Sequence, residues 1–374
     1  MNVKKISVVS AVFILCLMIA GIVCASGEKK IRAADQEEES EFIIESVSET
    51  INPVVPAPQA ALTTTGSSNA AYIHELPIGD TASFHEVWGY VMAGREGEFN
   101  SSMPITDLCL FSADVNTYGE LSTIPDPSKI KNYKGRIHLV ITCEGRSLTH
   151  FALDPQYPVR KKLIADIVKA SKKFDGIQID FETIPARDAA NFRSFLGDVR
   201  NGIGRDKWFS VAVPARIREI SDDIFNYRLI TPLADRLIIM AYDEHWSGSS
   251  PGSIASIDWC EKVAQYASSV IPQKKLVMGL PFYGRTWQSP SNASAWYYSG
   301  INRIMNENNV HSIQRDNTVP YFSFETTVTV TGYFEDTISL VTRCRMYQSM
   351  DVRKIAFWRI GQEDHSFWNY LTLD

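Results

Sequence analysis

Beginning at about residue 84, the sequence alternates between short, nearly continuous apolar runs and longer amphipathic stretches. A nearly continuous apolar run is typical of a parallel strand that is covered on both of its faces. Eight runs of this kind occur, at residues 87–92, 108–111, 137–141, 176–181, 209–213, 237–242, 276–280 and 355–358. We therefore expect eight strands that belong to one parallel sheet or barrel.

Helix-like segments lie between these runs. Residues 158–172 place Leu163 and Ile167 on one apolar stripe, and residues 186–199 and 257–270 have the same kind of periodicity. Alternating strands and helices predict a parallel α/β fold. Eight such units favour a closed (β/α)8 TIM barrel, whose active site lies at the C-terminal ends of the strands. Periodicity alone also permits an open doubly wound sheet.

Residues 285–340 form a segment that is longer than one connection in a barrel requires. The segment contains Trp296-Tyr297-Tyr298 and two strand-like stretches at residues 321–324 and 327–333. This aromatic content favours a small α+β insertion between strands 7 and 8, forming one wall of a cleft, over an unstructured surface loop.

The N-terminus has the pattern of an export signal. Lys4 and Lys5 precede an apolar run, and small residues around Cys24 suit cleavage after Ala25. We expect residues 1–25 to be a signal peptide and the protein to be exported, either extracellular, periplasmic or attached to the cell envelope. An uncleaved membrane anchor and lipid attachment at Cys24 are the alternatives.

The next segment, residues 26–83, differs in composition from the rest of the chain. It is rich in acidic residues, proline and threonine, which is typical of a disordered linker. The predicted organisation is therefore a signal peptide at residues 1–25, a linker at residues 26–83 and a catalytic barrel at residues 84–374.

Composition and cysteine spacing exclude several classes of function. The 374 residues have a formal net charge of −6 and contain no conspicuous Lys/Arg run, which argues against a nucleic-acid partner. The cysteines outside the signal fit neither a disulfide framework nor a zinc pattern, and we expect buried thiols. These cysteines are Cys109, Cys143, Cys260 and Cys344. We predict no metal site and no cofactor.

The most informative segment is Phe174-Asp-Gly-Ile-Gln-Ile-Asp-Phe-Glu182, which contains one of the predicted strands. Because side chains alternate along a strand, Gln178, Asp180 and Glu182 share one face, which in a barrel is the interior. Two carboxyls this close cannot both ionise freely, so the pKa of one of them is expected to rise. A carboxyl that stays protonated near neutral pH can serve as a general acid. The alternative is a buried polar network that only orders the barrel.

Several motifs together resemble one enzyme family. The pattern Asp175-Gly-x-x-x-Asp180-x-Glu182 is similar to the signature strand of glycoside hydrolase family 18, the chitinase-like barrels. Further segments resemble other parts of that family: Met240-Ala-Tyr-Asp243, Leu280-Pro-Phe-Tyr-Gly-Arg285, Gly332-Tyr-Phe-Glu-Asp336 and Trp358. The segment at residues 332–336 is most similar to that of bacterial cell-wall-lytic and spore-cortex-lytic members.

The resemblance implies a retaining mechanism in which the substrate supplies the nucleophile. Glu182 then protonates the glycosidic oxygen and later activates water, while the acetamido oxygen of the substrate attacks the anomeric carbon to give an oxazolinium ion. Asp180 orients the acetamido N–H, and Tyr242 donates a hydrogen bond to the acetamido oxygen. The substrate-binding candidates are Asp243, Met240, Trp358, Gln178, Tyr90 and Tyr283, with Trp358 stacked beneath the sugar ring. Glu144 either contacts substrate or is simply solvated, and the sequence does not decide between these.

Such a mechanism requires a 2-acetamido sugar at the cleavage site. It implies a β-1,4-linked N-acetylglucosamine polymer such as chitin or peptidoglycan, or an N-glycan core, as the partner of a monomeric enzyme. The acidic linker and the export signal favour peptidoglycan and an association with the membrane or cell wall through the N-terminus. A lectin-like barrel that binds glycans without cutting them, and a wall-anchored structural protein, are the alternatives, although the presence of Glu182 favours catalysis.

Gln178 is a departure from the family pattern, in which many members carry a third Asp at this position. An amide can form a hydrogen bond to Asp180 but cannot share its proton. We expect an altered pH profile rather than lost activity, because Asp180 and Glu182 are both present.

Overall fold

The structure is a computed structural model that describes residues 76–288 and 293–374. The predicted signal peptide and most of the predicted linker lie outside the described residues. Within the described part of the chain, no helix is long and apolar enough to cross a membrane. The first strand, β1 (Ala82–Phe84), begins shortly before residue 84 and pairs in parallel with β15 (Leu371–Leu373).

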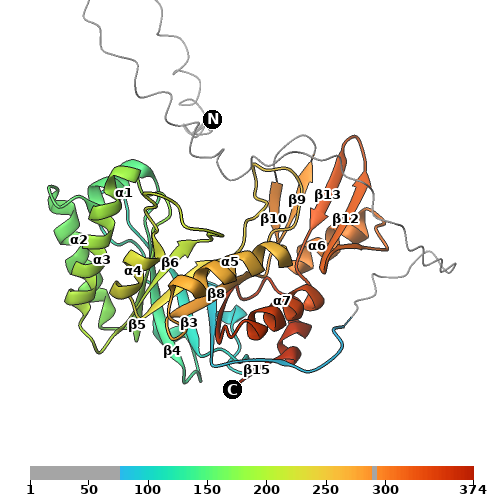
Figure 1. Cartoon of the computed structure of the whole chain (residues 1–374), viewed down its shortest axis with the longest axis horizontal. Helices are drawn as coiled ribbons and strands as arrows, with labels where there is room; N and C mark the ends of the chain where they lie inside the picture. Colours follow the sequence, from blue (N-terminus) through green and yellow to red (C-terminus); the bar gives the residue numbers. More distant parts are fainter. Residues whose placement is uncertain (1–75, 289–292) are drawn as a thin grey trace, which may run out of the picture. The chain divides into compact units, whose positions relative to one another are not determined.

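Eight parallel strands close into a barrel, as the apolar runs predict (Figure 1). In their order around the barrel they are β14 (Lys354–Trp358), β2 (Glu86–Met92), β3 (Asp107–Asp114), β4 (Arg136–Thr142), β5 (Gly176–Asp180), β6 (Trp208–Pro214), β7 (Arg236–Met240) and β8 (Leu276–Pro281). Each of the eight predicted runs overlaps one of these strands. The closed barrel is therefore confirmed over the open sheet.

Helices follow most of the strands and cover the outside of the barrel. They are α1 (Arg146–Leu153), α2 (Pro158–Ser171), α3 (Ala189–Ile203), α4 (Tyr227–Ile230), α5 (Ile257–Val270) and α7 (Thr337–Ser349). Short 3-10 turns occur at Glu96–Glu98, Pro127–Lys129, Ala186–Asp188, Thr231–Leu233 and His365–Tyr370. The helix predicted at residues 257–270 is confirmed with its bounds. The helix predicted at residues 186–199 starts as a 3-10 turn and becomes α-helical at Ala189.

Sequence explains where α5 begins and which face it buries. The hydroxyl of Ser256 caps the helix by accepting a hydrogen bond from the Trp259 amide, which satisfies one of the free N–H groups at the helix N-terminus. Cys260, Val263 and Ala267 recur at helical spacing and are all buried. The helix therefore covers the barrel with a stripe of small and branched side chains.

Between β8 and α7 the chain forms the predicted α+β insertion, drawn in orange in Figure 1. Its five strands are ordered β10 (Ala293–Trp296), β9 (Gly284–Gln288), β13 (Thr329–Tyr333), β12 (Val319–Glu325) and β11 (Gln314–Asp316). One face of the sheet packs against α6 (Tyr298–Glu307) around Ile301, Met305 and Phe322. The insertion thus has its own small hydrophobic core.

The main core lies between the barrel strands and their helices. Val91, Ile141, Ile179 and Leu237 are fully buried there. The four cysteines expected to be buried thiols are indeed buried and unpaired. Since the outward-facing strand residues fill this layer, the remaining strand side chains point into the barrel, where the polar candidates lie.

Candidate active site

The candidate residues converge on the C-terminal rim of the barrel. Asp180 ends β5, and Glu182 follows it by two residues. Met240 ends β7 and is half-buried, directly before Ala241, Tyr242 and Asp243. Tyr283 follows β8, and Trp358 ends β14. In a barrel of parallel strands these ends meet at one face, which is where such barrels carry their active sites.

The alternation predicted for β5 is observed. Gln178 and Asp180 are buried polar side chains inside the barrel. Phe181, on the other face, stacks against Phe195 of α3 with a ring separation of 5.6 Å. The strand therefore separates a polar interior from an apolar exterior, and this separation directs the carboxyl of Asp180 inward.

Gln178 does not form the hydrogen bond to Asp180 that the sequence allowed. Its carbonyl oxygen accepts a bond from the Tyr90 hydroxyl at 2.6 Å, and its amide nitrogen donates to the Ser210 hydroxyl at 3.1 Å. The physical reason is the register of the barrel, because Ser210 lies directly opposite Gln178 on β6. Gln178 thus joins β2, β5 and β6 beneath Asp180.

Asp180 is a buried carboxyl with an unsatisfied oxygen. Its side chain is 7% exposed, and Oδ1 has no hydrogen-bond partner among the described residues. Burial, and secondarily the negative charge of Glu182, raise the pKa of Asp180 to about 8. A buried polar atom without a partner is costly in a folded protein and calls for an explanation.

Glu182 lies at the solvent-exposed rim. Although its surface is accessible, the surrounding protein removes part of the hydration of its carboxyl, and this raises its pKa. The negative charges of Asp243 and Glu144 act in the same direction. Glu144, which sequence left undecided, is therefore close enough to influence the charge state of Glu182.

Tyr242 stands beside both carboxyls. Burial, and then the charges of Asp180 and Glu182, raise the pKa of its phenol well above the ordinary value, so it is a hydrogen-bond donor at neutral pH. The ring passes over Gly279 of β8. A Cβ atom at position 279 would lie 2.7 Å from the Ile239 carbonyl oxygen and 3.1 Å from the Tyr242 ring. Glycine at this position therefore makes room for the Tyr242 side chain.

Asp243 is held in place by two residues after β8. The Tyr283 hydroxyl donates to Asp243 Oδ1 at 2.6 Å, and Arg285 Nη2 donates to the same oxygen at 2.8 Å. The backbone of Asp243 has a φ of 60°, a left-handed conformation that is uncommon outside glycine. Arg285, in β9, was missed as a site residue although it ends the Leu280–Arg285 motif.

Trp358 is surrounded by two aromatic rings. Tyr90 lies 5.4 Å from it and Phe111 lies 4.6 Å from it, both measured between ring centroids. Phe111 of β3 was also missed, because its apolar run gave no sign of which residues face the interior rim. The three rings form an aromatic cluster on the side of the barrel where β14, β2 and β3 are neighbours.

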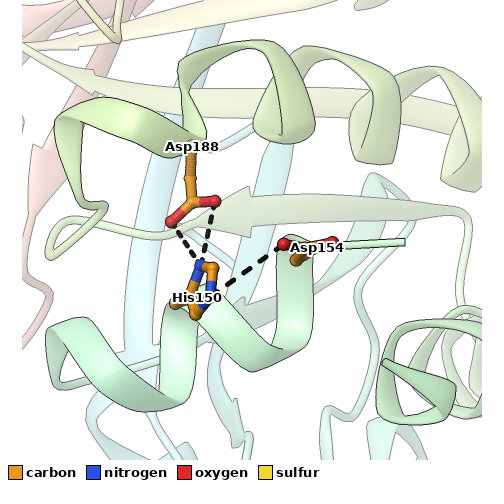
Figure 2. A group of neighbouring side chains, drawn as sticks. All are labelled: His150, Asp154 and Asp188. Carbon is orange, nitrogen blue, oxygen red and sulfur yellow. Dashed lines mark hydrogen bonds and ion pairs between the residues drawn. The ribbon is translucent and has the colours of Figure 1, made fainter. Parts of the chain in front are cut away.

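Among the described residues, possible metal ligands come together on the helical segments that follow β4 and β5. One group of possible ligands, drawn in Figure 2, consists of His150, Asp154 and Asp188. Asp188 already accepts hydrogen bonds from His150 Nδ1 at 2.9 Å and from Asn191 Nδ2 at 2.9 Å. We therefore interpret the group as a hydrogen-bonded cluster that connects α1 to the start of α3 and satisfies the buried carboxylate of Asp188.

Known proteins resemble this chain in sequence. Residues 101–363 match the family described as "Glycosyl hydrolases family 18". The cortical fragment-lytic enzyme of Bacillus anthracis is 26% identical over 291 residues, which cover 72% of this chain and 67% of that protein. The uncharacterized glycosylase YvbX of Bacillus subtilis is 25% identical over 228 residues, which cover 56% and 64%. The chain spans 49% to 67% of the length of the Bacillus relatives it matches.

Solved structures share the fold. The spore cortex-lytic enzyme SleL of Bacillus cereus superposes with a TM-score of 0.70 at 24% identity, covering 80% of this chain and 76% of that one. A chitinase from Chromobacterium violaceum superposes with a TM-score of 0.68 at 20% identity, covering 76% and 97%. Since the family match spans most of the barrel, from residue 101 to residue 363, the chain belongs to family 18 of the glycosyl hydrolases.

Proposed function

We propose that this chain is a retaining glycoside hydrolase that cleaves β-1,4-linked N-acetylglucosamine-containing glycans through an oxazolinium intermediate. The observation that carries the proposal is the buried carboxyl of Asp180, whose Oδ1 has no partner, next to the solvent-accessible carboxyl of Glu182. An acetamido N–H of a bound sugar is the kind of donor that would satisfy this oxygen. The positions of the other residues at the rim support the roles proposed for them below.

The two carboxyls together hold a proton near neutral pH, because the pKa of each is raised. A substrate N–H that bonds to Asp180 favours its ionised form, so the proton is then held by Glu182. Glu182 donates this proton to the glycosidic oxygen as the bond between that oxygen and the anomeric carbon breaks. The acetamido oxygen attacks the anomeric carbon, and the resulting positive charge is stabilised by the carboxylate of Asp180.

The remaining rim residues position the sugar in this scheme. The Tyr242 phenol remains protonated and donates a hydrogen bond to the acetamido oxygen, which aims that oxygen at the anomeric carbon. Trp358 offers an aromatic face for the sugar ring. In the second half of the reaction, Glu182 is a carboxylate and removes a proton from the water that opens the oxazolinium ring.

We propose peptidoglycan as the substrate in preference to chitin. The similarity to cortical fragment-lytic enzymes of Bacillus supports this choice, since these are among the chain's relatives. The acidic linker behind a predicted export signal supports it too. We also propose export with cleavage after Ala25. Protein recovered from culture fluid should then begin at Ser26, and a start at Met1 would contradict cleavage.

The test uses N-acetylglucosamine oligomers and purified peptidoglycan with wild type and Glu182→Gln. Wild type should release products that mass spectrometry identifies, and the variant should lose about 10²- to 10⁴-fold in kcat, the range typical of a general acid. Because the amide has the same shape, the variant should still bind the oligomers. Binding without cleavage by wild type would favour a lectin-like protein and overturn the proposal.

A further inference from the structure

The N-terminal ends of the barrel strands surround a hollow on the face opposite the catalytic rim. Its volume is about 460 Å³, within the range of small-ligand sites. Its lining includes Glu86, Trp208, Arg236 and Lys354, each at or near the first residue of its strand. Because the catalytic candidates lie at the other ends of the strands, an occupant here would not block the substrate.

Trp208 forms a rigid part of this hollow. The guanidinium of Arg136 lies 4.5 Å from the centre of its ring system, and that of Arg236 lies 4.7 Å from it. Cations at these distances are attracted to the face of an indole. Both guanidinium groups are also ion-paired, that of Arg136 with Asp107 and that of Arg236 with Glu86, so uncompensated positive charge has to come from the lysines.

The carboxylates of the hollow are already occupied by arginine. Glu86 Oε2 accepts a hydrogen bond from Arg236 Nε at 2.8 Å, and Arg236 Nη2 bonds the other oxygen. Asp235 accepts bonds from Arg200 Nη1 at 3.1 Å and from the Phe209 amide at 2.9 Å. Their negative charge is therefore balanced before the lysines are considered.

Three lysines in the lining have ammonium hydrogens that are available for further hydrogen bonds. Lys354 is only 8% exposed, yet its ammonium donates a bond to the Gln273 carbonyl at 3.2 Å and has two further hydrogens. The ammonium of Lys275 donates to the Thr231 and Ala234 carbonyls, which leaves one of its three hydrogens for another acceptor. Lys274 is exposed. The nearby Asp351 is ion-paired with Arg353.

A buried ammonium without a carboxylate partner is costly, and it becomes favourable when an anion binds. Burial lowers the pKa of Lys354, and the charge of Arg236 adds to this effect, while the charges of Glu86 and Asp351 partly offset it. Burial likewise lowers the pKa of Lys275, and its cationic neighbours act in the same direction, while the charge of Asp235 acts in the opposite one. Since burial is the main cause in both cases, each ammonium has lost hydration that hydrogen bonds to a bound anion could replace.

We propose that this hollow binds a phosphate-type oxyanion through Lys274, Lys275 and Lys354. The oxyanion is either a free phosphate ion or a phosphodiester group of an anionic polymer. The lysines supply the free N–H donors, and Trp208 lines the hollow beside them. Charge-assisted hydrogen bonds from ammonium to phosphate are among the stronger ones in proteins.

The experiment measures binding to the whole chain by calorimetry at constant ionic strength. Inorganic phosphate, a glycerol phosphate oligomer and chloride are the three probes. Wild type should bind phosphate and show a rise in Tm that chloride does not reproduce, because a ligand that binds only the folded state stabilises it. Tighter binding per phosphate group by the oligomer assigns the site to a polymer, and equal binding assigns it to the free ion.

Two variants and a control identify the site. Lys354→Gln and the exposed Lys274→Gln should each weaken phosphate binding by about tenfold, corresponding to the loss of one charged hydrogen bond. Lys169→Gln, an exposed lysine on α2, should bind as wild type does. Hydrolysis of soluble N-acetylglucosamine oligomers by Lys274→Gln should be unchanged. Wild type that does not bind phosphate or the oligomer, or Lys274→Gln that titrates like wild type, would overturn the proposal.

Discussion

At the scale of single residues, Asp180 is a buried carboxyl whose placement inside the barrel costs stability. It is buried without a partner for Oδ1, and its pKa is raised to about 8. Functional sites are where such costs persist, because the missing partner is supplied by the ligand. Its neighbours Gln178 and Tyr90 bond to each other and leave the carboxyl free for substrate.

Asp180→Asn should change how stability depends on pH. The folded pKa of about 8 lies above the ordinary value of 3.8, so the folded state holds this proton more tightly. The contribution of Asp180 to stability is therefore complete below about pH 4 and is lost as pH rises through about 8. Urea unfolding should show that the free energy of unfolding of wild type is lower at pH 8 than at pH 5. In the variant this decrease should be smaller by roughly 2 kcal/mol or more. Equal falls in both proteins would contradict the raised pKa.

Gln178→Asp should move the alkaline limb of the kcat/KM profile upward by about one pH unit. A carboxyl at position 178 adds a like charge near Asp180 and makes deprotonation of the pair harder. Gln178→Asn is the matched control, since asparagine has the same size as aspartate but no charge. Both variants therefore disturb the bonds to Tyr90 and Ser210 equally. If the Asp and Asn variants have superimposable pH profiles, residue 178 has no part in setting the charge of the pair.

At the scale of elements, the site depends on contacts between β9 of the insertion and the loop after β7. Arg285 and Tyr283 share Asp243 Oδ1 and thereby attach the insertion to the barrel rim. Asp243 in turn raises the pKa of Glu182 by its charge. Through Arg285 and Asp243, the insertion therefore influences the charge state of Glu182, the proposed general acid.

Arg285→Gln should lower kcat/KM by about tenfold and shift its alkaline limb to higher pH. The loss corresponds to one charge-assisted hydrogen bond. The shift follows because the charge of Asp243, no longer balanced, makes Glu182 harder to deprotonate. Tyr283→Phe removes a neutral donor from the same oxygen and should reduce kcat/KM with a smaller shift. Identical pH profiles for the two variants would contradict an electrostatic role for Arg285.

At the scale of the whole molecule, the alternation of apolar runs and amphipathic stretches in the sequence predicted the architecture. All eight barrel strands occur where the apolar runs indicated them, and the α+β insertion occurs where the length and aromatic content of residues 285–340 indicated it. This succeeded because parallel strands covered on both faces need uninterrupted apolar residues, which few other elements contain. The inward direction of Gln178 and Asp180 followed from strand alternation alone.

The contacts between distant segments were not predictable in the same way. Ser210 binds Gln178 because β5 and β6 pair in a particular register, which a single strand does not encode. Arg285 reaches Asp243 across 42 residues, through the geometry of an insertion whose placement depends on tertiary packing. Sequence thus indicated which residue types carry the chemistry, while the closed barrel determines which of them touch.

The most direct test of the central claim is the configuration of the first product. Proton NMR of N-acetylglucosamine oligomers during the first minutes of hydrolysis distinguishes the two anomers before they interconvert. If Asp180 and Glu182 direct attack by the substrate's own acetamido group, the β-anomer should appear first, because two inversions retain the configuration. Initial release of the α-anomer would show direct attack by water and contradict the account.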